Sequence, residues 1–218
     1  MITQLETDKP KRETVFIVDD DPSICEGLIN LLESVGIAGR SYPSAEAFAK
    51  EWEPASAGCL LLDARLPGIS GVEFQEKLQE SGIGLPVIFM TAHGDMPMVR
   101  KVMKAGAMEF LIKPFQKEEL LHAVEQAFAV DRARRSEEKA VSSIRARIDS
   151  LTAREREVMA MVTAGLLNKQ IAAELNLSEI TVKLHRRGVM ERMQAGSVAE
   201  LVKMCERVKE PSWTGSKE

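Results

Sequence analysis

The sequence has few cysteines, no long apolar run and no strong excess of either charge. Its three cysteines form no C-x-x-C pair, so neither a disulfide framework nor a zinc site is expected, and we predict reduced thiols in the core. No apolar stretch approaches the roughly 18 residues that a membrane-spanning helix needs, and the start of the chain is polar and charged. We therefore expect a cytoplasmic protein with no membrane partner.

The charges are divided unevenly along the chain. Residues 1–140 hold 16 Lys and Arg against 23 Asp and Glu, whereas residues 141–210 hold 12 against 9. The small basic surplus of the second part falls short of the strongly basic footprint that predicts a nucleic-acid partner. Charge alone therefore does not decide whether this part binds nucleic acid.

The first part of the chain has the pattern of a parallel sheet flanked by helices. From Val15 to Phe115, short apolar runs alternate with amphipathic stretches. We predict an α/β fold with a doubly wound, five-stranded parallel sheet and a helix after each strand. Asp21 and Pro22 have the residue types that cap and begin a helix. The strands are expected at residues 15–18, 38–41, 59–62, 87–90 and 110–112.

The second part is helical throughout. A run of mixed charge at residues 131–139 contains no Gly or Pro, and we predict a continuous linker helix there. Residues 151–208 predict about four helices, with turns near Gly165, Asn176 and Gly196. We place the first domain at residues 13–130, the helical linker at 131–148 and an all-α four-helix domain at 149–210.

Polar residues follow the predicted strands of the first domain. Asp19 and Asp20 follow the first strand, and Asp63, Thr91 and Lys113 end the third, fourth and fifth. The carboxyl ends of parallel strands meet at one edge of the sheet, where ligands bind. Any one of the acidic residues is explained as well by a turn or a helix cap. Their joint occurrence favours a site where carboxylates hold Mg²⁺ and a lysine with a hydroxyl binds a phosphoryl group.

These residues lie in stretches that resemble the receiver domain of two-component response regulators. The stretches match that domain in order and spacing, and they run from Val18 to Asp21, Leu62 to Gly71, Met90 to Asp95 and Phe110 to Phe115. The resemblance implies a flavodoxin-like sheet and a histidine kinase that phosphorylates the chain. A proline directly after Lys113 predicts a constrained turn, of which a cis peptide bond is one form.

The same resemblance implies a role for each residue of the site. Asp63 is the phosphoacceptor. Asp20, Asp63 and the backbone carbonyl of Arg65 hold Mg²⁺, and Asp19 assists. The remaining expected residues are Thr91 and Lys113, which contact phosphoryl oxygens, and Phe110, which is the aromatic switch.

A phosphatase of the haloacid dehalogenase type is an alternative for the first domain, because it too forms an aspartyl phosphate at a strand end. Such an enzyme needs a second aspartate two residues after the first as its acid and base. The sequence has Arg65 at that position. We therefore predict a protein that takes part in its own aspartyl phosphorylation and dephosphorylation but is not an enzyme.

Residues 168–193 have the pattern of a helix-turn-helix. A short helix at 168–175 is followed by a turn at Asn176 and a second helix that Ser178 caps. At helical spacing, Val182, Val189 and Met193 form one apolar stripe that faces a core. The opposite side, which suits the major groove, carries Ile180, Lys183, Leu184 and Arg187, and the flanks, which suit phosphates, carry Thr181, His185 and Arg186. An ordinary amphipathic helix with a solvated basic face is the alternative.

The second domain resembles the LuxR-type DNA-binding domain. The resemblance rests on residues 151–155, 162–165, 168–172, 175–178 and 181–186, and it continues almost to Val208. A receiver followed by this domain resembles the FixJ-type response regulators, which are transcription factors. This implies double-stranded promoter DNA as a partner, RNA polymerase as a candidate partner and a homodimer on phosphorylation. The implied DNA contacts are Thr181, Lys183, Leu184, His185, Arg186 and Arg187.

Two residues depart from the expected pattern of the second helix. Glu191 places an acid where relatives often carry a base. Gly188 is expected to weaken the helix by about 0.5 to 1 kcal/mol relative to Ala. A helical domain that binds another protein remains the alternative, and it predicts phosphorylation without salt-dependent DNA affinity.

Overall fold

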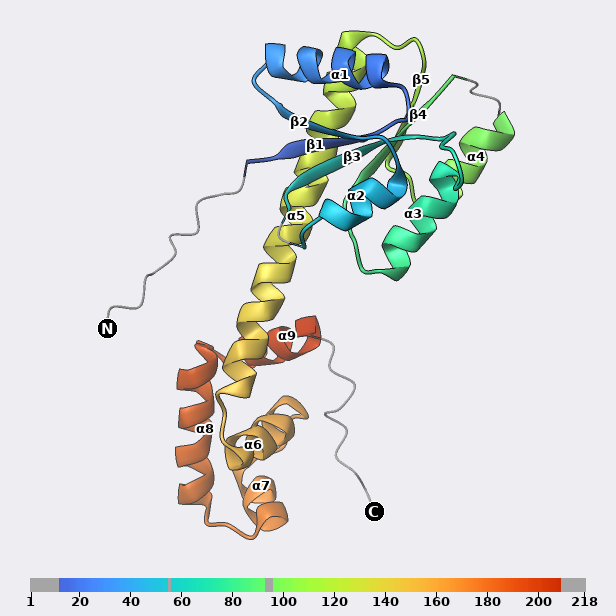
Figure 1. Ribbon diagram of the computed structural model, residues 1–218. Coiled ribbons are helices and arrows are strands. Elements are labelled where there is room, and N and C mark those ends of the chain that lie inside the picture. Colours follow the sequence, from blue (N-terminus) through green and yellow to red (C-terminus); the bar gives the residue numbers. More distant parts are fainter. Residues whose placement is uncertain (1–11, 55, 93–95, 209–218) are drawn as a thin grey trace. The chain divides into compact units, whose positions relative to one another are not determined.

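The protein forms two compact units, Met1–Arg134 and Arg135–Glu218. The computed structural model describes residues 12–54, 56–92 and 96–208 (Figure 1). Residues 93–95, which belong to one of the receiver-like stretches, lie outside this description. Within the described ranges, no helix is both long and apolar enough to cross a bilayer.

The first unit is built on a fully parallel sheet with the strand order β2-β1-β3-β4-β5. The five predicted strands are confirmed, and each is one or two residues longer than expected. This order is the flavodoxin-like one: β2 is added on one side of β1 and the later strands on the other, so the topological switch point lies between β1 and β3. The strands are β1 (Thr14–Val18), β2 (Ala38–Tyr42), β3 (Gly58–Asp63), β4 (Val87–Thr91) and β5 (Glu109–Ile112).

Helices cover both faces of this sheet (Figure 1). They are α1 (Pro22–Ser34), α2 (Ala45–Glu51), α3 (Gly71–Glu80), α4 (Met96–Lys104) and α5 (Lys117–Asp149). Alternate residues of β1 show the layering, since Val15 and Ile17 are buried with α1 and α5, whereas Phe16 and Val18 are buried with α2, α3 and α4. The doubly wound α/β prediction is therefore confirmed.

Helix α1 begins as its sequence predicts. The Asp21 side chain is the N-cap and accepts hydrogen bonds from the backbone N–H of Ser23 at 2.8 Å and of Ile24 at 3.4 Å. Pro22 occupies the first turn, where a missing N–H costs nothing. The third aspartate of the acidic run therefore starts a helix, and the first two remain for another role.

Helix α5 is continuous over 33 residues, as the absence of Gly and Pro predicts. Its first half contributes Leu120, Val124 and Phe128 to the core of the first unit. Its last turns contribute Ile144 and Ile148 to the core of the second. The core of the second unit therefore includes residues that precede position 149.

The second unit consists of the end of α5 and four further helices, α6 (Ala153–Thr163), α7 (Asn168–Leu175), α8 (Glu179–Met193) and α9 (Val198–Val208). This agrees with the predicted number. Helices α6 and α7 both pack on α8, and α9 packs on α6. The most deeply buried side chains of this core include Val158, Met159, Ile171, Val182 and Leu201.

The three cysteines are free thiols, as predicted. Cys25 and Cys59 are buried, and Cys205 is half-buried. Burial raises the pKa of each thiol, which keeps it protonated and poorly reactive at neutral pH.

Candidate functional site

The polar residues predicted to share a site do come together at the carboxyl ends of the strands. Asp19 follows β1, Asp63 ends β3, Thr91 ends β4 and Lys113 follows β5. One carboxylate oxygen each from Asp19, Asp20 and Asp63 lies within 4.8 Å of the others. Asp19 is buried, Asp63 is largely buried and Asp20 is exposed, so the cluster opens to solvent on the side of Asp20.

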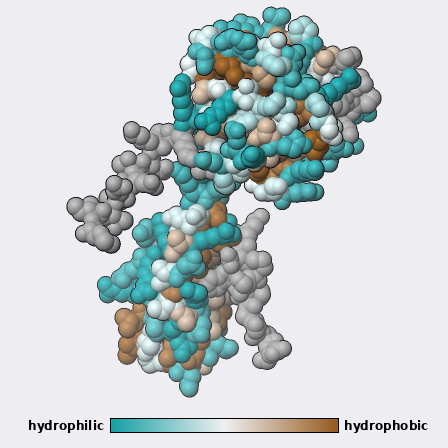
Figure 2. Space-filling view, in the orientation of Figure 1, coloured by the Kyte–Doolittle hydropathy of each residue, from teal (hydrophilic) through white to brown (hydrophobic). Residues whose placement is uncertain are grey.

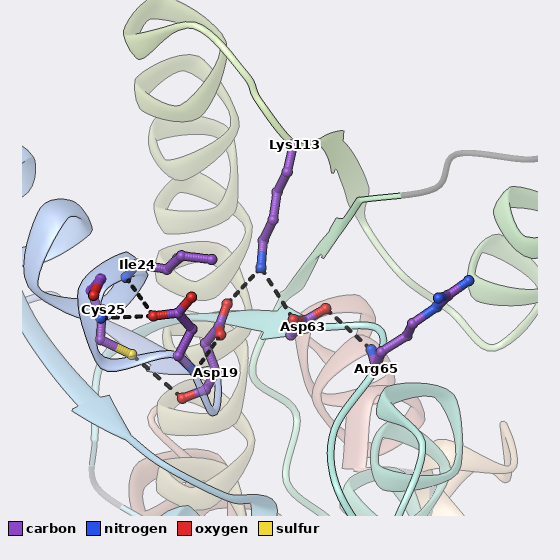
Figure 3. A network of polar contacts seen from close by, with 8 residues as sticks. Asp19, Ile24, Cys25, Asp63, Arg65 and Lys113 are labelled. Atoms are coloured by element: carbon purple, nitrogen blue, oxygen red, sulfur yellow. Dashed lines mark hydrogen bonds and ion pairs between the residues drawn. The ribbon is translucent and has the colours of Figure 1, made fainter.

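Lys113 joins two of these carboxylates. Its Nζ donates to Asp19 Oδ2 at 2.6 Å and to Asp63 Oδ2 at 3.1 Å (Figure 3). Burial alone would lower the pKa of the ammonium group, but its hydrogen bonds to Asp19 and Asp63 and their negative charge outweigh burial and raise it. The peptide bond between Lys113 and Pro114 is cis. The lysine therefore stays charged in the presence of both acids.

Backbone groups fix the orientation of the two buried carboxylates. The N–H of Arg65 donates to Asp63 Oδ1 at 3.1 Å, and the N–H of Asp21 donates to Asp19 Oδ1 at 3.0 Å. The Arg65 side chain is exposed and points away from Asp63 (Figure 3). Arg65 thus contributes to this site through its backbone.

The donor set fits a hard divalent cation. Three carboxylates supply oxygen ligands, which Mg²⁺ prefers. Lys113 alone does not neutralise three carboxylates, and close carboxylates repel one another unless positive charge offsets them. The arrangement can therefore bind a cation and, beside it, an anionic phosphoryl group.

Thr91 and Phe110 lie on the neighbouring strands β4 and β5, with Thr91 at the end of β4 that faces the cluster. Thr91 is buried at the end of β4, and its carbonyl accepts a hydrogen bond from the backbone N–H of Lys113 at 2.8 Å. Phe110 is half-buried in β5, pairs with Phe89 of β4, and packs against the core on the face that α2, α3 and α4 cover. Thr91 thus joins the end of β4 to Lys113, and Phe110 lies in the strand that precedes this lysine.

Gly71 is a residue of the site to which the sequence pattern assigned no role. A Cβ atom at Gly71 would lie 2.5 Å from the carbonyl oxygen of Asp63. Its N–H donates to the Ala64 carbonyl at 3.2 Å, and α3 begins directly against the end of β3. The glycine that closes the stretch from Leu62 to Gly71 is the signal that would have identified it.

Helices α7 and α8 form the predicted helix-turn-helix. Asn176 ends α7 in the left-handed conformation (φ 54°, ψ 48°), and the N–H of Leu177 donates to the Ala172 carbonyl at 2.9 Å. Ser178 caps α8, because its Oγ accepts from the N–H of Thr181 at 3.1 Å. The predicted turn and cap are both confirmed.

The faces of α8 are arranged as its periodicity predicts. Val182, Val189 and Met193 are buried in the core. On the opposite side, Ile180 is 79% exposed and Leu184 is 68% exposed. The predicted DNA contacts on this side are the exposed Lys183, Leu184 and Arg187, and those at the flanks are the half-exposed Thr181, His185 and Arg186.

Both arginines of α8 that are predicted to contact DNA have partners within the unit. Arg186 Nη1 donates to Asn168 Oδ1 at 2.8 Å, which connects α8 to the start of α7. Arg187 Nε donates to Glu191 Oε1 at 2.7 Å along the exposed face. Glu191, the acid that departs from the expected pattern, therefore pairs with Arg187, which is one of the predicted DNA contacts.

Gly188 permits close packing between α6 and α8. A Cβ atom there would lie 2.5 Å from Glu155 Oε1. Glu155 accepts hydrogen bonds from the N–H and Oγ1 of Thr152 and forms an ion pair with Arg192 at 3.0 Å. Burial would raise the pKa of Glu155, but these hydrogen bonds and the charges of Arg192 and His185 lower it. The contact with Glu155 therefore explains why a glycine occupies position 188, although glycine has a low helix propensity.

Comparisons with known proteins agree with both parts of this description. Residues 15–125 match the family model of response regulator receiver domains, and residues 149–205 match that of bacterial regulatory proteins of the luxR family. Nodulation protein W of Bradyrhizobium diazoefficiens is 44% identical over 200 residues, which are 92% of this chain and 88% of that protein. Transcriptional regulatory protein FixJ of Rhizobium meliloti is 41% identical over 192 residues, which are 88% and 94% of the two chains.

A solved structure is also similar over both parts. The response regulator StyR is 45% identical with a TM-score of 0.79, and the match covers 90% of this chain and 99% of StyR. The matches to StyR and to the FixJ relative each cover 88% or more of this chain, and so extend over both matched regions. The chain belongs to the response regulators of two-component systems, in the group of transcription regulators where a receiver domain precedes a LuxR-type DNA-binding domain.

Proposed function

We propose that a histidine kinase phosphorylates Asp63 and that this modification controls dimerisation, DNA binding and transcription. The observation that carries the proposal is the convergence of Asp19, Asp63 and Lys113 at the carboxyl edge of the sheet, with Lys113 Nζ within 3.1 Å of both carboxylates. Residues 13–130 would serve as the receiver, residues 131–148 as the linker and residues 149–210 as the DNA-binding domain, in the cytoplasm, where the DNA lies.

The chemical step is a transfer from nitrogen to oxygen. A carboxylate oxygen of Asp63 forms a bond to phosphorus, and the bond between phosphorus and the kinase imidazole nitrogen breaks and leaves its electron pair on that nitrogen. Lys113 and the Thr91 hydroxyl would contact the phosphoryl oxygens, whose charge requires fixed positive groups and donors. Dephosphorylation would be the attack of water on the same phosphorus.

Mg²⁺ would be held by Asp20, Asp63 and the backbone carbonyl of Arg65, with Asp19 assisting. When bound, this ion supplies charge neutralisation for the acyl phosphate. Asp19 also accepts the shortest hydrogen bond from Lys113, at 2.6 Å, so it would keep the lysine beside Asp63.

The switch would use Thr91 and Phe110. A Thr91 side chain that moves towards the phosphoryl group leaves space, and the half-buried Phe110 would turn inward to fill it. The change would alter the surface of α4, β5 and α5, where we propose that two phosphorylated chains dimerise. A dimer would place two α8 helices on half-sites about one helical turn of DNA apart.

The exposed face of α8 would enter the major groove. Lys183, Leu184 and Arg187 would contact base edges there, because they lie opposite the buried stripe of the helix. Thr181, His185 and Arg186, at its flanks, would contact phosphates. Arg186 can do so while it donates to Asn168, since a guanidinium carries five N–H donors. RNA polymerase is the further partner that we propose at the promoter.

The phosphoacceptor is tested with acetyl phosphate and Mg²⁺, with intact mass as the readout. We expect one phosphoryl group on the wild type and none on Asp63→Asn. Asp21→Asn is the matched control, because Asp21 caps α1 and an asparagine can keep that cap. Phosphorylation of Asp63→Asn, or none of the wild type, would contradict the proposal.

The output is tested by light scattering with Mg²⁺ and beryllofluoride as a phosphoryl mimic. A rise from monomer to dimer in the wild type, absent in Asp63→Asn, is the expected result. An unchanged mass at an occupied site would exclude dimerisation as the output. A phosphorylated protein whose binding to duplex DNA lacks salt dependence would instead favour a protein partner for the second domain.

A further inference from the structure

Two large apolar side chains project from the face of α8 that is opposite the core. Among the described residues, Ile180, Leu167 and Leu184 are the most exposed large apolar side chains, at 79%, 69% and 68%. Ile180 and Leu184 are one helical turn apart, so they lie side by side along the helix. Hydrophobic surface is visible on the outer side of α8, among hydrophilic surface (Figure 2).

The charges beside this apolar pair restrict what it can contact. Lys183 and Arg187 are exposed on the same face of α8. A partner for this face must therefore offer negative charge and hydrogen-bond acceptors together with small apolar groups. The major groove of DNA does so, since guanine presents acceptors, the backbone presents phosphates, and the C5 methyl of thymine is the apolar group on its base edges.

The position of Ile180 favours contact with bases. It is the second residue of α8, and the first turns of a recognition helix meet base edges in a helix-turn-helix. The Ser178 cap fixes this turn, and a β-branched side chain has few rotamers to lose on binding. The side chain is thus presented rigidly, at low entropic cost.

We propose that Ile180 and Leu184 contact the C5 methyl groups of two thymines in the major groove. The inference rests on the proposed entry of α8 into DNA and adds the chemical group that the apolar pair recognises. Four residues of helix advance about 6 Å, and base pairs are about 3.4 Å apart. The two thymines therefore lie about two base-pair steps apart, next to the acceptors that Lys183 and Arg187 contact.

The decisive probe is deoxyuridine, which differs from thymidine only by the missing methyl group. The full chain, loaded with Mg²⁺ and beryllofluoride, is used to enrich duplexes from a random library. Each thymine of the enriched duplex is then replaced in turn by uracil. We expect an affinity loss of about fourfold at each of two positions in every half-site that one α8 contacts, from the apolar area of one methyl, and none at the other thymines.

Substitutions assign the effect to side chains. Ile180→Ala and Leu184→Ala are each expected to abolish the thymine preference at one position and to leave the salt dependence of binding unchanged. Leu167→Ala is the matched control, because it removes an equally exposed apolar side chain that is outside α8. Lys183→Ala should weaken binding to the thymine and uracil duplexes by the same factor.

Three outcomes would overturn the inference. Uracil tolerated at every position by the wild type excludes methyl contacts. A full thymine preference in both alanine variants excludes Ile180 and Leu184 as the contacts, and leaves another partner, such as a protein, for the apolar pair. Failure to enrich any sequence would overturn the proposed DNA contacts of α8 themselves, and this result is distinct from the other two.

Discussion

Replacing Asp131 by alanine should destabilise the first unit substantially. Asp131 lies in α5, and its side chain is fully buried. Its Oδ2 accepts a hydrogen bond from the N–H of Gly58, the first residue of β3, at 3.0 Å, and its Oδ1 pairs with Arg134 Nη2 at 2.5 Å. Gly58 itself lies tightly against β1, because a Cβ there would lie 1.8 Å from the Thr14 carbonyl oxygen. The carboxylate therefore holds α5 against the beginning of the sheet.

The magnitude follows from what the substitution leaves behind. Removing one partner of a buried ion pair costs about 3 to 5 kcal/mol. The Arg134 side chain is 26% exposed, so it can recover part of its hydration, and we expect the lower end, about 3 kcal/mol. Asp131→Asn keeps an acceptor for Gly58 and removes only the charge, so its cost should be about 1 to 2 kcal/mol.

Urea unfolding provides the assay, with Trp52 fluorescence as a signal for the first unit. A Trp213→Phe background removes the second tryptophan, which lies outside the described residues. Glu125→Ala is the control, since Glu125 is an exposed acid on α5 in the same unit. A loss below about 1 kcal/mol for Asp131→Ala, or equal losses for the alanine and asparagine variants, would refute the reasoning.

Three further predictions concern the second unit. Glu191→Gln should raise affinity for all DNA sequences alike and steepen the dependence of binding on salt, because it removes a negative charge from the exposed face that approaches the phosphates; an unchanged salt slope in a binding titration would count against this. Gly188→Ala should lower the free energy of unfolding by about 1 to 3 kcal/mol, since its Cβ would overlap Glu155; thermal unfolding that shows a gain would mean that propensity prevails. The pKa of Glu155 is lower in the folded unit than in the unfolded chain, so the ionised carboxylate stabilises the folded unit. This stabilisation is complete above the unfolded pKa of about 4.3, and it is lost as the pH falls through the lower folded pKa. Glu155→Gln should therefore lose less stability than the wild type between about pH 5 and pH 3, as measured by urea unfolding at each pH.

The strands and the acidic site could be predicted from the sequence because their signals are local. Apolar runs mark the strands, and Asp63 and Lys113 directly end or follow one. In a parallel sheet, strand ends of the same kind lie at the same edge, so the short-range pattern also fixes which residues meet. The residues that meet at this edge could therefore be predicted without knowing any contact between distant residues.

Contacts between residues far apart in the sequence could not be predicted in this way. Asp131 belongs to a mixed-charge run that is typical of a solvated linker, and its partner Gly58 is 73 residues away. Gly188 appears as a weak position in a helix until Glu155 of α6 is placed beside it. In both cases the physical reason lies in tertiary packing, which local propensity does not contain.

The position of Asp131 limits how a change at the proposed phosphorylation site can spread along α5. The site lies at the carboxyl ends of the strands, whereas Gly58 begins β3 at the opposite end of the sheet. Helix α5 starts four residues after Lys113 and runs past the sheet to Asp131. Any rearrangement that moves α5 must either carry the bond between Asp131 and Gly58 along with the sheet or break it. A shift of the helix relative to the sheet that breaks this bond therefore costs about 1.5 to 3 kcal/mol, the usual contribution of a hydrogen bond to a charged group, and Asp131→Ala would remove that cost.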